Sequence, residues 1–306
     1  MPKDLHSLPK LRDSLTYIYI EKAVIEQDAT SIVSVQGTRR TPIPIAAMTV
    51  LLLGPGTSIT HAAIKAISDC GCMVEWCGEK AQKFYAFGTG ETRSAENLLK
   101  QAELCMDQEK HMQVVYRMYR RRFPEMHTEG MTLQQVRGLE GIRVREAYKS
   151  AAKEAGVKWT KRNYKTTDWD DSDPINQALS YANTILYALC QSAIISLGYS
   201  TGLGFIHTGK QLSFVYDIAD LYKATTTIPA AFQAVAQNDS DLYSLVRFKC
   251  RQYLHAQKVL KRIPEDIAWI FDISCDIEGL SVEDVGNLWD GDGNTIEGGK
   301  NYGGGA

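Results

Sequence analysis

Residues 204–220, GFIHTGKQLSFVYDIAD, place a histidine and two aspartates among apolar residues. Asp217 and Asp220 are three positions apart, so a helix would present both carboxylates on one face, where they repel each other unless a cation lies between them. Divalent cations such as Mg²⁺ prefer carboxylate oxygens, and the imidazole of His207 would add a nitrogen ligand that also suits Mn²⁺. Lys210 is placed to contact a phosphate. The segment is therefore a candidate metal site for chemistry on phosphate.

A more ordinary interpretation of the same segment stays open. A histidine in an apolar helical region is usually a packed residue. An Asp-x-x-Asp pair near a helix start is often there only because it lies favourably at the positive end of the helix dipole. A third acid close to the pair would favour the metal site.

Glu140 is such an acid, and its surroundings in QQVRGLEGIRVREAY are unusual. It lies between Gly138 and Gly141 within an otherwise strong helical pattern. Glycine inside a helix costs roughly 1 kcal/mol relative to alanine, so we expect another group to approach the backbone closely there. Three arginines surround the glutamate, at Arg137, Arg143 and Arg145. Either they pair with its carboxylate, or Glu140 is a metal ligand and the arginines hold a phosphate backbone.

Residues 1–88 predict a β domain with one short helix. The segments LTYIYIEKAVIEQ, TSIVSVQ and TVLLLG are rich in β-branched, aromatic and apolar residues, and MVEWCG and KFYAFG predict a hairpin. Between them, THAAIKAISDCG has Thr60 as a capping residue, apolar residues at helical spacing and Gly71 as a stop, which predicts a helix. We expect a β-sandwich-like domain.

Residues 89–93 predict a linker, and residues 94–279 a second, all-helical domain that carries the catalytic residues. Helical spacing of apolar residues predicts helices over 97–123, 134–155, 175–197, 217–223 and 241–261. Residues 280–306 are acidic, rich in glycine and poor in core-forming residues, so a disordered tail is predicted. The predicted fold class is α+β.

The net charge of −2 conceals a strong asymmetry. Residues 110–165 hold 14 Lys or Arg against five acids, residues 245–262 hold six and no acid, and residues 264–297 hold ten acids and no Lys or Arg. Clustered basic residues permit phosphate contacts whatever the overall charge. The seven cysteines lack zinc spacing and predict reduced, mostly buried thiols. Without a signal peptide or an uninterrupted membrane-length segment, we expect a cytoplasmic protein that does not span a membrane.

Four sequence blocks together resemble the CRISPR adaptation (spacer acquisition) integrase/endonuclease family, subtype I-E. They are LLLGPGTSITHAAI, LQQVRGLEGIRVREAY, DPINQALSYANTILYALCQSAIISLGYSTGLGFIHTG and LSFVYDIADLYK, and the similarity runs from about residue 10 to residue 262. The resemblance implies that Glu140, His207 and Asp220 bind Mg²⁺ or Mn²⁺, and that Asp217 is a further required acid. It also implies a homodimer that works with a small ferredoxin-like CRISPR adaptation partner protein.

The implied reaction joins the 3′-hydroxyl ends of short foreign double-stranded DNA fragments into a CRISPR repeat by transesterification. A metal would neutralise a non-bridging phosphate oxygen and stabilise the leaving 3′ oxygen. The attacking hydroxyl belongs to DNA, and water in its place would give endonuclease activity. Candidate DNA contacts are Arg137, Arg143, Lys161, Lys210, Arg247 and Arg251.

Three other functions are compatible with parts of the pattern. Fifteen tyrosines allow a covalent tyrosine-recombinase mechanism, with Tyr164, Tyr187 and Tyr216 nearest to the motifs. A stand-alone structure-selective nuclease would use the same metal site on another substrate. A non-catalytic DNA-binding scaffold would keep the fold and lack the chemistry. Sensitivity to EDTA separates the metal mechanisms from the tyrosine mechanism.

Overall fold

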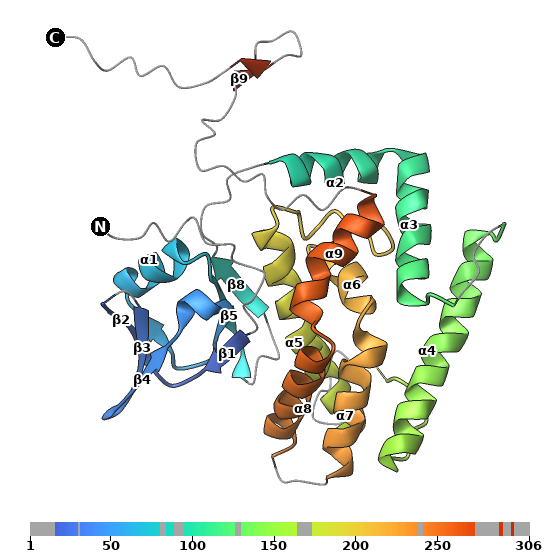
Figure 1. Cartoon of the computed structure of the whole chain (residues 1–306). Coiled ribbons are helices and arrows are strands. Elements are labelled where there is room, and N and C mark those ends of the chain that lie inside the picture. Colours follow the sequence, from blue (N-terminus) through green and yellow to red (C-terminus); the bar gives the residue numbers. More distant parts are fainter. Residues whose placement is uncertain are drawn as a thin grey trace.

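The computed structural model describes residues 16–29, 31–79, 84–88, 95–125, 130–163, 173–237 and 241–272, and two short strands at 288–289 and 295–296. Strands make up the N-terminal part of the described chain and helices most of the C-terminal part. The two parts lie side by side (Figure 1). This arrangement confirms the predicted α+β fold.

Two four-stranded sheets form within the described N-terminal part. The first has the order β1-β5-β7-β8 and contains β1 (Thr16–Ile20), β5 (Met48–Leu53), β7 (Met73–Cys77) and β8 (Phe84–Gly88). Strands β1, β5 and β7 are parallel, whereas β8 runs antiparallel to β7 and forms the predicted hairpin. The second has the order β4-β3-β2-β6 and contains β2 (Val24–Asp28), β3 (Ser31–Gln36), β4 (Arg39–Ile43) and β6 (Ser58–Ile59).

Strand β5 is buried on both faces and connects the two domains. Leu51 and Leu53 join a core that both sheets share with α1 (His61–Asp69), which makes the domain sandwich-like. Val50 and Leu52 point to the opposite face, because side chains alternate along a strand, and they join the core of the helical domain. The uninterrupted apolar run of this strand follows from burial on both sides.

The predicted helix of the β domain is α1, and its ends agree with the sequence signals. The hydroxyl of Thr60 accepts a hydrogen bond from the backbone N–H of Ala63 at 3.2 Å, as an N-cap does. The chain leaves the helix through Gly71, whose φ of 61° suits glycine.

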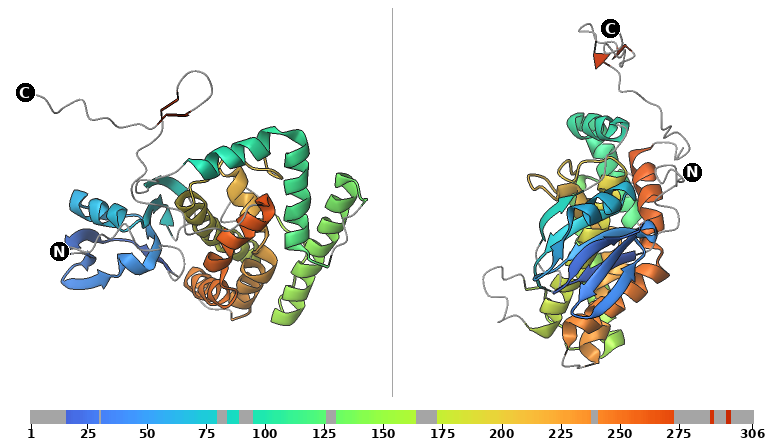
Figure 2. Two further views of the ribbon diagram at one scale, coloured as in Figure 1. Left: turned by 45° about the horizontal axis from the view of Figure 1, so that its top comes forward. Right: turned by 90° about the vertical axis from the view of Figure 1, so that its left-hand side faces the viewer.

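The helical domain is built on two long helices that were both predicted to within one residue at each end, α4 (Leu133–Ala155) and α5 (Pro174–Ser196). Around them lie α2 (Glu96–Met106), α3 (Gln108–Arg122), α6 (Ser213–Asp220), the 3₁₀ turn η4 (Lys223–Thr225), α7 (Thr227–Ala236), α8 (Leu242–Ala256) and α9 (Val259–Phe271). Helix α4 begins at a capping box of Thr132 and Gln135 and ends at the left-handed Gly156. In Figure 2 the β domain stands on one side of this bundle and α4 on the other.

Several predicted helix boundaries were wrong. The helix predicted over 97–123 breaks at Asp107, whose extended backbone lets its carboxylate cap α3 by accepting from the backbone N–H of Lys110. The helix predicted over 241–261 divides at Lys258, which is left-handed with a φ of 49°. Helix α6 starts at Ser213, one turn before the predicted start, and α7 was not predicted.

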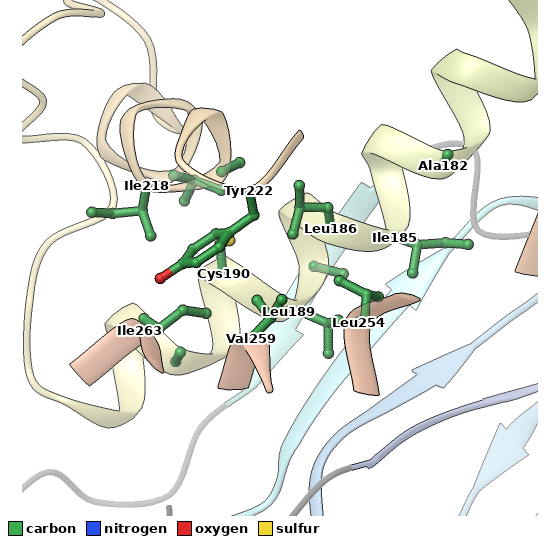
Figure 3. Close-up of a cluster of buried hydrophobic side chains, with 14 of the residues drawn as sticks. Ala182, Ile185, Leu186, Leu189, Cys190, Ile218, Tyr222, Leu254, Val259 and Ile263 are labelled. Carbon is green, nitrogen blue, oxygen red and sulfur yellow. The ribbon is translucent and has the colours of Figure 1, made fainter. Parts of the chain in front are cut away.

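Helix α5 lies at the centre of the helical core. Figure 3 shows Leu186, Leu189 and Cys190 of α5 among the side chains of neighbouring elements: Ile218 of α6, Tyr222 just after α6, Leu254 of α8, and Val259 and Ile263 of α9. In the described part of the chain it is the one helix long and apolar enough to cross a membrane, with a mean hydropathy of 1.3 over its best window. Because 67% of that window is buried inside the molecule, α5 is a core helix here, as its polar residues Asn183 and Gln191 predicted.

The predicted linker, residues 89–93, lies outside the described residues, so the domain boundaries 1–88 and 94–279 stay predictions. Of the predicted tail, 280–306, only β9 (Leu288–Trp289) and β10 (Thr295–Ile296) are described, and they pair antiparallel. The cysteines of the described part are free thiols, in agreement with the prediction.

Candidate active site

Asp217 is a buried anchor for the loop that carries His207. The residue, on α6, is 1% exposed, and its carboxylate accepts hydrogen bonds from three backbone N–H groups, those of Phe205 at 2.6 Å, Ile206 at 3.1 Å and His207 at 2.9 Å. A fourth contact joins its Oδ1 to the ring Nδ1 of His207 at 2.8 Å. The carboxylate therefore shapes the loop and orients the ring.

This contact assigns the two ring nitrogens of His207 to different roles. A carboxylate oxygen can only accept, so Nδ1 carries the hydrogen and Nε2 of the neutral ring keeps a free lone pair. The hydrogen bond that the ring donates to Asp217 raises the pKa of His207 by stabilising the protonated ring. The side chain is 42% exposed, so the ring is partly open to solvent. A buried carboxylate behind an imidazole is the usual arrangement behind metal-binding histidines.

Position 204 requires glycine because its backbone lies very close to the same loop, and sequence reasoning missed this requirement. A Cβ at this position would collide with the carbonyl oxygen of His207 and with Ser213. Glycine is thus needed for the loop to fold back onto α6. The sequence signal that could have indicated this requirement is the glycine that opens the GFIHTG motif.

Glu140 and Asp220 come together from α4 and α6 around one cation, the guanidinium of Arg122. Nη1 of Arg122, the last residue of α3, contacts Oε1 of Glu140 and lies 3.4 Å from Oδ2 of Asp220. Lys223 holds the other oxygen of Asp220 at 2.6 Å. Burial by itself would raise the pKa of Asp220, but the charges of Lys223 and Arg122 outweigh it and lower that pKa. Sequence reasoning did not predict that either cation pairs with these carboxylates.

The donor set suits a divalent ion, although the side chains are not closed around one. In the described residues, no three His, Cys, Asp or Glu side chains gather closely enough to hold a metal. A cationic nitrogen nevertheless bridges Glu140 and Asp220, and His207 lies close enough to Asp220 for their charges to interact. Oxygen and nitrogen ligands of this kind fit Mg²⁺ or Mn²⁺. The predicted ligands therefore fit the ion, with Arg122 between two of them.

Two of the three candidate tyrosines lie beside these residues. The ring of Tyr216 lies edge-on to that of His207, with 5.8 Å between centroids, and the ring of Tyr187 lies 5.0 Å from that of Tyr216. The ammonium of Lys223 lies 4.9 Å from the centroid of the Tyr187 ring. Tyr164 is outside the described residues. The tyrosines thus form one wall of the candidate site.

The six candidate DNA contacts differ in their contacts within the protein and in their exposure. Arg143 pairs with Glu125, and Arg247 lies over the ring of Tyr19 at 5.5 Å, where the β domain meets α8. The other four are exposed: Arg137, Lys161, Lys210 and Arg251. Contact with DNA stays a prediction for all six.

The expected close approach to the glycines of α4 does not occur within the described chain. A Cβ added at Gly138 or Gly141 would meet no atom within 4 Å. Both positions face open space, so any group that needs glycine there must come from outside the described residues.

The family model described as "CRISPR associated protein Cas1" matches residues 16–129 and 124–244, most of the chain. The chain belongs to the Cas1 family. It is 47% identical to "CRISPR-associated endonuclease Cas1 2" of Thermus thermophilus over 99% of this chain and 94% of that protein. This membership confirms the family resemblance, whereas subtype I-E stays a prediction.

Solved structures agree with the Cas1 assignment. "Crystal structure of TtCas1-DNA complex" superposes with a TM-score of 0.67 at 49% identity, covering 86% of this chain and 99% of that one. "Casposase bound to integration product" superposes with a TM-score of 0.63 over 87% of this chain and 95% of that one, at 13% identity, which shows the fold alone.

Proposed function

We propose that this Cas1 family member is the metal-dependent DNA integrase and endonuclease of a subtype I-E CRISPR adaptation system. It would join 3′-hydroxyl ends of short foreign DNA to a CRISPR repeat by transesterification, and cleave DNA where water attacks instead. The observation that carries the proposal is the convergence of Glu140 and Asp220 on one cation beside the oriented ring of His207.

Each residue then has a distinct task. Glu140, Asp220 and Nε2 of His207 would hold Mg²⁺ or Mn²⁺, and Asp217 would keep the ring and its loop in place. The ion, when bound, supplies charge neutralisation at the phosphate and at the leaving 3′ oxygen. Lys210 follows His207 closely on the same exposed loop and would bind a neighbouring phosphate. The nucleophile comes from DNA, so no side chain has to form a covalent bond.

Similarity to a protein solved together with DNA supports a DNA substrate. The chain in "Crystal structure of TtCas1-DNA complex" is 49% identical to this one. We further propose, from the family resemblance, a cytoplasmic homodimer that acts with a small ferredoxin-like partner.

A covalent tyrosine mechanism is the second candidate, because Tyr216 and Tyr187 lie beside His207 and Lys223. It requires no metal, so the two mechanisms predict opposite results in EDTA.

The test is strand transfer of a short duplex with free 3′-hydroxyls into a supercoiled plasmid that bears a CRISPR repeat, with the small partner present. Wild type, His207→Ala and the exposed control His61→Ala are compared in Mn²⁺ and in EDTA. We expect joined product only with metal and only in wild type and the control. Joining in EDTA would refute the metal mechanism. Metal-dependent cleavage without joining would favour the stand-alone nuclease, and DNA binding without either activity the scaffold.

A further inference from the structure

Arg122 is unusually placed for an arginine that only stabilises a fold. Its side chain is 10% exposed, at the point where α3 meets α4 and α6. One nitrogen, Nη1, serves both Glu140 and Asp220. Its Nε is buried and has no hydrogen-bond partner among the described residues. An unsatisfied buried donor is destabilising, so the carboxylates, rather than a complete set of hydrogen bonds, hold the guanidinium in this position.

The two carboxylates depend on Arg122 to different degrees. Asp220 keeps Lys223 on its other oxygen at 2.6 Å if the guanidinium leaves. Within the described part of the chain, Glu140 has no other ion-pair partner than Arg122. Moving Arg122 away would therefore leave Glu140 as an uncompensated, largely buried carboxylate that only another cation could neutralise.

We propose that Arg122 is a built-in counter-cation that holds Glu140 and Asp220 together in the metal-free protein and that a divalent ion must displace from Glu140. The inference rests on the metal site of the proposed function. It assigns Arg122 a regulatory task, because the guanidinium and the ion compete for the same carboxylates. Removing the competitor strengthens metal binding and weakens the metal-free fold.

The test measures Mn²⁺ affinity by electron paramagnetic resonance of the free ion, in the full chain, without DNA. The variants are Arg122→Gln, the neighbouring exposed control Arg120→Gln, which removes the same charge, and Glu140→Gln. We expect Arg122→Gln to bind Mn²⁺ about tenfold more tightly than wild type, equivalent to about 1.4 kcal/mol. We expect no change for Arg120→Gln and a large loss for Glu140→Gln.

Two outcomes would overturn the inference in distinguishable ways. If wild type binds Mn²⁺ through Glu140 but Arg122→Gln binds it equally or more weakly, Arg122 is a positioning residue and only the inference fails. If wild type shows no Mn²⁺ binding that Glu140→Gln removes, the proposed metal site fails, and the inference with it.

A second measurement decides the matter if Arg122→Gln does not fold, as judged by circular dichroism. Crystal structures of wild type with and without Mn²⁺ would show whether the guanidinium moves. Separation of Nη1 from Glu140 in the Mn²⁺ form supports displacement. An intact Arg122–Glu140 contact beside a bound ion overturns it.

Discussion

Glu75 is a buried carboxylate whose ionisation the fold opposes. It lies on β7 between Met73 and Cys77, which point into the helical core, so its side chain is on the face where the two domains meet. The residue is 2% exposed, and its Oε1 has no hydrogen-bond partner among the described residues. Burial raises the pKa of Glu75 to about 8 from 4.5.

The sign of the effect on stability follows from the two pKa values. Below pH 4.5 the carboxyl is protonated in both the folded and the unfolded chain, and between pH 4.5 and about 8 only the unfolded chain ionises. The contribution of Glu75 to the free energy of unfolding is therefore fully present below pH 4.5, and it is lost progressively as the pH rises to about 8. One pH unit corresponds to about 1.4 kcal/mol, so the loss reaches about 3 kcal/mol at pH 7.

Glu75→Gln removes the ionisation and keeps the shape of the side chain. We expect the variant to be more stable than wild type by roughly 1–3 kcal/mol at pH 7–8, with part of the gain offset by the second donor of the amide. Near pH 4 the gain should vanish. The difference between the two proteins should therefore grow with pH.

The assay is urea unfolding followed by circular dichroism at several pH values from 4 to 9. Glu79→Gln, an exposed residue just beyond the same strand, is the matched control and should follow wild type. A difference between Glu75→Gln and wild type that does not change with pH would refute the assignment of a neutral, buried Glu75. A variant less stable than wild type at pH 8 would do the same.

Two further predictions concern the site itself. Asp217→Asn should lower Mn²⁺ affinity about 10–100-fold, because an amide cannot replace a carboxylate that accepts from the His207 ring and from three backbone N–H groups. Titration of free Mn²⁺ measures the affinity. Unchanged affinity would contradict the orienting role of Asp217. Gly138→Ala and Gly141→Ala should each stabilise the fold by about 0.5–1 kcal/mol, because a Cβ there meets open space. If the DNA backbone approaches α4 at these glycines, both variants should also bind duplex DNA more weakly. Urea unfolding and a DNA titration measure the two effects, and a more stable variant with unchanged DNA affinity would show that DNA does not need these glycines.

Local signals in the sequence were sufficient where an element depends on its own residues. The Thr60 cap and the apolar run of β5 both predicted what the structure contains. The same kind of reasoning failed at Asp107 and Lys258. Both lie in helical patterns without glycine or proline, and each helix is broken by the backbone conformation of a single residue, extended at Asp107 and left-handed at Lys258.

The sequence by itself determined the types and spacing of the groups that can do chemistry: the acids, the histidine and the glycine-bounded Glu140. It also identified Asp217 and Asp220 as a pair, but not that Asp217 faces a loop and Asp220 faces two cations. Only the tertiary structure decided that Arg122 bridges Glu140 and Asp220. These three residues come from three different helices, so no sequence spacing relates them. Their contact depends on how α3, α4 and α6 pack. Because the carboxylates are largely buried there, their charges need a neighbouring cation.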